Sequence, residues 1–140
     1  MLVYQSHDGD LLCDQIYTMD LSTRETKLVS TGLGVTTCAY FEHPKGENII
    51  YASTHLGGGS CPSKPDYSRG YVWKLYPDYD IFKSIKDRKI LEQMTDSPGY
   101  DAEATVAFDG SKVLYTSITS GDLEVWSMNT DGSNKTQLTN

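Results

Sequence analysis

The sequence predicts an all-β protein made of repeated four-stranded antiparallel sheets, and three observations lead to this fold class. Short runs rich in Val, Ile, Thr and Tyr follow one another along the 140 residues, and such residues favour strands. Asp-Gly and other turn-forming pairs separate the runs, as expected of hairpins. The runs also recur in the same order, which is typical of an architecture that stacks one structural unit several times.

The C-terminal segment, 101–139, shows this unit most clearly. Its four strand-like runs read AEATVAF, KVLYTS, LEVWSMN and KTQLT. Asp109-Gly110 joins the first two runs, and Thr130-Asp131-Gly132-Ser133 joins the last two. Gly accepts a positive φ without steric cost and Asp bonds to its own backbone, so both residues favour tight turns. The segment therefore predicts one four-stranded meander.

The same strands appear in two earlier copies, as expected because a single meander cannot bury both of its faces. The second strand reads Tyr4-Gln5-Ser6, Tyr51-Ala52-Ser53 and Tyr115-Thr116-Ser117 in the three copies. The third strand reads Ile16-Tyr17-Thr18-Met19-Asp20, Ile81-Phe82-Lys83-Ser84-Ile85 and Val125-Trp126-Ser127-Met128-Asn129. The fourth reads Lys27-Leu28-Val29-Ser30, Glu92-Gln93-Met94-Thr95 and Thr136-Gln137-Leu138-Thr139. We therefore expect Tyr4, Tyr51 and Tyr115 to occupy equivalent positions on their second strands.

This pattern resembles the WD40-like (PD40) repeat of TolB-like β-propellers. The residues that carry the resemblance are DGSKVLYTS at 109–117, WSMNTDGS at 126–133 and QLT at 137–139. The resemblance extends over nearly the whole chain, although the second copy departs in its loops. It implies the blades of a β-propeller, in a ring normally of roughly six blades, exported to the periplasm or cell surface and used for binding.

We expect a single partial propeller domain, 1–140, with three blades. Blade 1 covers about 1–32, blade 2 about 33–97 and blade 3 about 98–140. Blade 1 is incomplete, because Leu2-Val3-Tyr4 already matches its second strand. Three blades are fewer than a closed propeller contains. Either the chain is a piece of a longer propeller, which we favour, or two chains pair as a homodimer that closes a ring of roughly six blades.

Composition excludes two classes of partner. The formal net charge of -7 and the lack of a basic stripe argue against nucleic acid. No apolar run is long enough to cross a membrane, so membrane insertion is not expected. The family resemblance implies a periplasmic or extracellular location, although no signal peptide is present in this chain.

Blade 2 carries a long insertion, 55–79, between its second and third strands. Insertions of this length are usually functional or disordered, and this one holds too many aromatic residues for a solvated linker. We expect it to fold over one face of the propeller, at the mouth of the central channel. There Trp73, Tyr76 and Tyr79 would form a ligand wall.

Further candidate ligand-binding residues lie at the end of the second strand of blade 2 and at the entry of blade 3. They are His55, Tyr100, Asp101 and Glu103. A His beside two carboxylates could bind a metal or polarise a substrate, but a hydrogen-bonded loop anchor is the simpler interpretation of His55. Asp101 could likewise cap its own loop instead of facing a ligand. No metal, other cofactor or catalytic residue is predicted.

The three cysteines are an odd count, which predicts no disulfide framework. Cys38 falls in an inner strand, where a small buried residue is expected. Cys13 and Cys61 fall in equivalent loops of adjacent blades. In an exported protein a bridge between them would staple the long insertion, whereas two free thiols are the favoured interpretation.

Two functions fit these features. The favoured one is a non-catalytic binding module that engages a protein or carbohydrate ligand on its loop face. The alternative is the propeller portion of a larger hydrolase or polysaccharide lyase, with the catalytic residues mostly outside this chain. His7, His43 and His55 are scattered over loops and no Gly-x-Ser-x-Gly elbow occurs, which favours binding.

Overall fold

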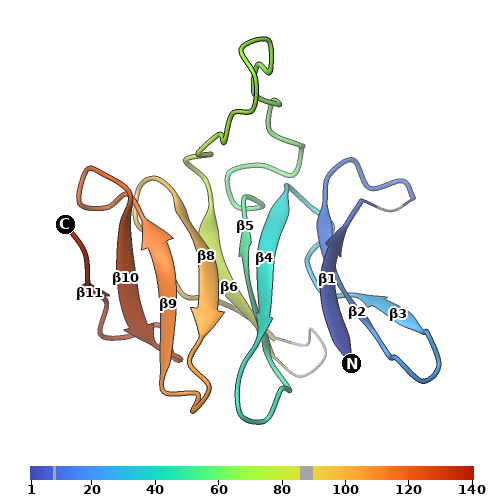
Figure 1. The fold of residues 1–140 in the computed structure, drawn as a ribbon. Coiled ribbons are helices and arrows are strands. Elements are labelled where there is room, and N and C mark those ends of the chain that lie inside the picture. Colours follow the sequence, from blue (N-terminus) through green and yellow to red (C-terminus); the bar gives the residue numbers. More distant parts are fainter. Residues whose placement is uncertain (8, 86–89) are drawn as a thin grey trace.

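The structure, a computed structural model, describes residues 1–7, 9–85 and 90–140. Strands in this part of the chain form three antiparallel sheets that stand side by side, one for each blade (Figure 1). In the same residues no helix is long and apolar enough to span a membrane. The fold class is therefore all-β, as predicted.

Each blade is a simple meander, because neighbouring strands in each sheet are also consecutive in the sequence. Blade 1 contains β1 (Leu2–Ser6), β2 (Gln15–Met19) and β3 (Thr26–Leu28). Blade 2 contains β4 (Thr36–Phe41), β5 (Ile49–Ser53), β6 (Asp80–Ile85) and β7 (Ile90–Gln93). Blade 3 contains β8 (Asp101–Val106), β9 (Lys112–Ser117), β10 (Glu124–Asn129) and β11 (Thr136–Gln137). Among the described residues, blade 1 has three strands and no counterpart of β4 and β8, as the sequence predicts.

The strand registers confirm the predicted repeat. In each blade the tyrosine of the second strand lies opposite an aromatic residue of the third strand. The pairs are Tyr4 with Tyr17, Tyr51 with Phe82, and Tyr115 with Trp126. Tyr4, Tyr51 and Tyr115 therefore occupy equivalent positions. Cross-strand aromatic pairs of this kind stabilise a sheet.

A hydroxyl group beyond the outer strand ties each blade together in the same way. It accepts a hydrogen bond from a backbone N–H of the third strand: Ser30 from Ile16 (3.0 Å), Thr95 from Ile81 (2.8 Å) and Thr139 from Val125 (2.9 Å). It also donates to the side chain that opens that strand, which is Gln15, Asp80 or Glu124 respectively. The final Ser or Thr of each repeat is therefore a structural residue, which explains its recurrence.

Apolar side chains fill both interfaces between neighbouring sheets. Blades 1 and 2 meet through a cluster that contains Ile16, Val29, Ile49, Tyr51 and Phe82. Blades 2 and 3 meet through a second cluster that contains Ile50, Ile81, Met94, Val113, Tyr115 and Met128. The core therefore lies between the blades, where each sheet covers one face of the next.

The innermost strand of blades 2 and 3 contains a β-bulge at the same place. The register shifts between Thr37 and Tyr40 in β4, and between Ala102 and Thr105 in β8. Within the bulges, Cys38 and Glu103 have φ values of 53° and 60°. A β-bulge changes the direction of a side chain and interrupts the hydrogen bonds between the two strands locally. The prediction that Cys38 is buried is wrong, because the bulge leaves this residue partly exposed.

Candidate functional site

The insertion in blade 2 forms a long loop, 54–79, with no strand or helix of its own. Figure 1 shows this loop at the end of the sheets where β4 and β8 begin, beside the loop that joins β1 to β2. The β4–β5 and β8–β9 hairpins lie at the opposite end. Long loops grouped at one end of a rigid scaffold are common places for binding sites.

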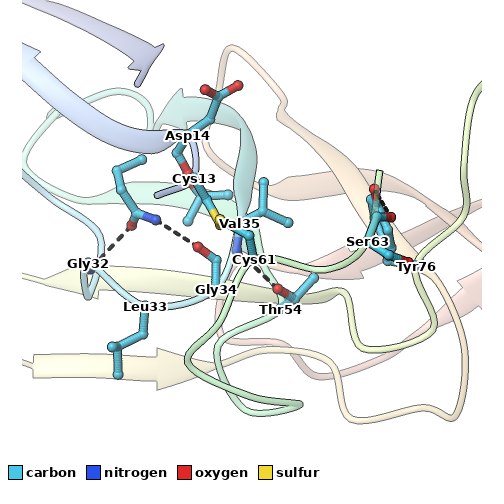
Figure 2. Close-up of a disulfide and its surroundings, with 12 residues drawn as sticks. Cys13, Asp14, Gly32, Leu33, Gly34, Val35, Thr54, Cys61, Ser63 and Tyr76 are labelled. Carbon is cyan, nitrogen blue, oxygen red and sulfur yellow. Dashed lines mark hydrogen bonds between the residues drawn. A yellow bond between two sulfur atoms is a disulfide. The ribbon is translucent and has the colours of Figure 1, made fainter. Parts of the chain in front are cut away.

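A disulfide fixes the first part of the long loop to blade 1. Cys13 in the β1–β2 loop is bonded to Cys61, with 5.6 Å between the two Cα atoms (Figure 2). The backbone N–H of Gly34 also donates to the carbonyl of Gly59 (3.0 Å). Figure 2 shows both cysteines close to Gly34, Val35 and Thr54, at the junction of blades 1 and 2. The loop is therefore held by two blades rather than by one.

Polar and aromatic contacts brace the second part of the loop. Lys74 donates to the carbonyl and hydroxyl oxygens of Ser63 (3.1 and 2.9 Å), and the Tyr76 hydroxyl donates to the same carbonyl (3.1 Å). The Lys74 ammonium lies 5.1 Å from the centre of the Tyr76 ring, a cation–π contact. Tyr79 then packs edge-on against Tyr100, with ring centres 5.6 Å apart. The loop thus ends against the entry of blade 3.

An open cleft of about 260 Å³, the large cleft, lies between the long loop and the starts of β4 and β8. Four predicted ligand residues line it: Trp73, Tyr76, Tyr79 and Tyr100. Tyr67 and Tyr71 add further exposed rings from the loop, and Gln5, Thr36 and Thr37 supply polar groups from the blades. Val35, Pro65, Val72 and Lys74 complete the lining. The cleft therefore combines aromatic rings with a few polar groups, a composition that suits a ligand site.

A smaller cleft of about 150 Å³, the small cleft, adjoins the large one through Trp73 and Tyr100. Leu75, Glu103, Thr116 and Leu123 complete its lining. The Thr116 hydroxyl donates to Glu103 Oε2 (2.7 Å), and the Tyr100 hydroxyl lies 3.4 Å from Oε1. Trp73 Nε1 donates to the Tyr100 hydroxyl at 3.5 Å. Burial raises the pKa of Tyr100 to about 12, so its hydroxyl stays protonated at neutral pH.

His55 and Asp101 do not join these clefts. His55 packs against Phe82 with tilted rings whose centres are 4.4 Å apart, and Nδ1 lies 2.9 Å from the Ser53 hydroxyl. Burial lowers its pKa, so the imidazole is neutral at pH 7. These contacts are those of a loop anchor. In the part of the chain that the structure describes, no three His, Cys, Asp or Glu residues gather as metal ligands.

Asp101 is instead a buried acidic residue that lies near Asp80 of blade 2, which is partly buried. The Asp101 side chain is 1% exposed and accepts a hydrogen bond from the Ser97 hydroxyl (3.0 Å). Asp80, at the start of β6, lies near enough for its charge to interact with that of Asp101. Burial, followed by this repulsion, raises the pKa of Asp80 to about 6, and burial also raises the pKa of Asp101. Sequence reasoning missed Asp80, since an acidic residue that opens a strand looks like a solvated one.

Comparison with solved structures identifies the architecture to which these sheets belong. TolB from Acinetobacter baumannii superposes with a TM-score of 0.70 at 22% sequence identity, over 98% of this chain and 29% of that one. A structure described as TolB from Agrobacterium tumefaciens gives 0.72 at 20% identity, over 96% and 43%. The fold is that of a TolB-like β-propeller.

A second kind of propeller shares the arrangement less closely. A chain of the nidogen–laminin complex superposes on this TolB-like chain with a TM-score of 0.61 at 13% identity, over 89% of this chain and 39% of that one. The TolB-like chain thus spans less than half the length of each of these structures. No protein-family model and no curated protein matches the sequence. At these identities the similarity establishes the fold alone.

Proposed function

We propose that this TolB-like propeller is a non-catalytic binding module that engages a protein or carbohydrate ligand in the two clefts under the long loop. One observation carries the proposal: four aromatic residues that the sequence marks as ligand candidates line one cleft. Trp73 is 56% exposed there, although its ring is large and apolar. Exposed aromatic rings grouped beside polar groups are typical of recognition surfaces.

The anchoring of the loop also supports a role in binding. A loop that is already ordered loses less conformational entropy when a ligand binds. The disulfide and the three bonds to Ser63 hold this loop through contacts within the chain itself. The aromatic residues are therefore presented in a fixed arrangement.

Titration of the chain with a pool of short peptides and a pool of neutral oligosaccharides tests this function. The NMR signal of the Trp73 indole N–H should shift with a member of one pool. Trp73→Ala removes this signal, so affinities of the variants are measured by calorimetry. Trp73→Ala should weaken binding about tenfold or more, since aromatic anchors dominate binding energies. Phe108→Ala is the control, because Phe108 is an exposed ring in the hairpin at the opposite end. Equal losses for both variants would refute the proposed site.

We also propose that the chain is exported to the periplasm or the cell exterior. The Cys13–Cys61 bridge supports this, since such bonds persist in oxidising compartments and are rare in the cytosol. In chain isolated from the cells that naturally make it, with thiols blocked at lysis, Cys13 and Cys61 should resist alkylation until the chain is reduced. Full alkylation of unreduced chain at Cys13 and Cys61 would count against export.

A further inference from the structure

Glu103 gives the small cleft a negative charge, and no cation among the described residues forms an ion pair with it. It is the one ionisable carboxylate among the lining residues, which otherwise carry aromatic, apolar or hydroxyl groups. Both of its hydrogen-bond donors, Thr116 and Tyr100, are neutral, and no ion pair involves it in the described residues. A carboxylate has about four acceptor positions, so Glu103 retains acceptor capacity for a ligand.

The surroundings of Glu103 suit a cation on a hydrocarbon stem. Trp73, Leu75 and Leu123 form apolar walls that can cover methylene groups. The exposed face of Trp73 can attract a cation as well, since an aromatic face is electron-rich. A volume of about 150 Å³ accommodates one side chain rather than a folded element.

We propose that the small cleft receives a lysine or arginine side chain from an extended segment of a protein partner, whose backbone runs along the large cleft. This inference rests on the proposed binding function and names the ligand that the site takes. Trp73 and Tyr100 line both clefts, so one segment can occupy the two together. The net charge of -7 would also attract a basic partner at long range.

The test compares two peptides, acetyl-Ala-Ala-Lys-Ala-Ala-amide and the same peptide with norleucine in place of lysine. They have similar stems and differ in the charge. With the full chain, followed by the Trp73 indole N–H signal, the lysine peptide should bind about tenfold more tightly than the norleucine peptide. Added salt should reduce this preference, because the site is partly open to solvent.

Glu103→Gln should bring the ratio of the two affinities to about one, since the amide keeps the shape and removes the charge. Glu47→Gln is the matched control, because Glu47 is exposed in the β4–β5 hairpin at the far end and loses the same charge. It should leave the ratio unchanged. If the Glu103 variant does not fold, the salt dependence of the wild-type preference decides the question.

Equal binding of the two peptides, or a lysine preference that survives either Glu103→Gln or high salt, would overturn the inference. A response to neutral oligosaccharides with none to either peptide would also overturn it, while the proposed binding function would stand. A Trp73 signal that responds to none of these ligands would refute both. The two proposals therefore fail in distinguishable ways.

Discussion

At the scale of single residues, the hydroxyl groups that end each repeat and the carboxylates of Asp80 and Asp101 make contacts whose contributions to stability can be tested. Thr95 is 1% exposed and accepts a hydrogen bond from Ile81, whereas Thr139 makes the equivalent bond in blade 3 at the surface. The same motif therefore exists in a buried and an exposed form, which allows one to be compared with the other.

Thr95→Val should lower the free energy of unfolding by about 1–3 kcal/mol, because it leaves the buried Ile81 N–H without an acceptor. Thr139→Val should cost less than about 0.5 kcal/mol, since water can replace the lost partner. Urea unfolding of the two variants measures both values. Equal losses of unfolding free energy in the two variants would mean that burial of the hydroxyl does not change its contribution to stability.

The pKa of Asp80 predicts a pH dependence of stability. Asp80 has a pKa of about 6 in the folded chain against 3.8 as its ordinary value. Between these values the folded state binds more protons than the unfolded state, so stability falls as pH rises from about 4 to about 6. The difference in the free energy of unfolding between wild type and Asp80→Asn should therefore decrease as the pH is raised from about 4 to about 6. Unfolding by urea at several pH values checks this, and a constant difference would contradict it.

At the scale of elements, the long loop behaves as a structural unit because it is attached at both ends. The disulfide connects it to blade 1, and the contact between Tyr79 and Tyr100 connects it to blade 3. Its described residues form no strand, so these attachments stand in for a hydrogen-bonded ladder. The shape of the clefts therefore depends on a few contacts.

Replacing both Cys13 and Cys61 with Ser should lower the free energy of unfolding by about 3 kcal/mol, because a crosslink restricts the unfolded chain. Trypsin should also cut the loop faster in the double variant, after Arg69, while the blades survive. Mass spectrometry of the fragments identifies the site. Unchanged cleavage in the loop would mean that the bonds to Ser63 suffice to hold it.

The strands could be predicted from the sequence because their signals are local. Tyr115-Thr116-Ser117 and its two earlier copies show alternation and turn residues within a few positions. The clefts were predicted in part, since aromatic content marked Trp73, Tyr76 and Tyr79. A loop anchor was the simpler interpretation of His55, but its contact with Phe82 was not predicted, because that contact depends on where β6 returns after the long loop. Contacts of this kind depend on the tertiary structure rather than on residues adjacent in the sequence.

At the scale of the whole molecule, one face of blade 3 is exposed where the other blades are covered. Leu114, Val125 and Leu138 are 40%, 40% and 54% exposed, whereas Ile50, Ile81 and Met94 at the same places in blade 2 are 0%, 0% and 4% exposed. The latter three are covered by blade 3. The face of blade 3 thus has the composition of a blade interface.

We expect this face to bind a further blade, which a second copy of the chain can supply from blade 1 as a homodimer. Burial of a Leu or Val side chain contributes roughly 1.5–3 kcal/mol, so Val125→Glu should prevent association. Leu12→Glu, which changes an exposed residue in the β1–β2 loop, should leave association unchanged. Light scattering measures the mass of each variant. A wild-type chain that stays monomeric at high concentration would contradict the homodimer.

The face that would associate lies near the small cleft, because Leu123 borders this cleft and directly precedes β10, the strand that carries Val125. The peptide titrations should therefore be made at one protein concentration for all variants. Otherwise a change in mass could be mistaken for a change in affinity.

The bulge in the innermost strand has a consequence for protein engineering. It recurs in blades 2 and 3 with the same backbone shape, yet holds cysteine in one and glutamate in the other. The fold thus tolerates different chemistry at one repeated backbone position, next to the end of the molecule where loops gather. Exchanging the side chains at Cys38 and Glu103 would transplant an acidic group from one blade to its neighbour. New specificities could arise in this way with no change in the strands that support them.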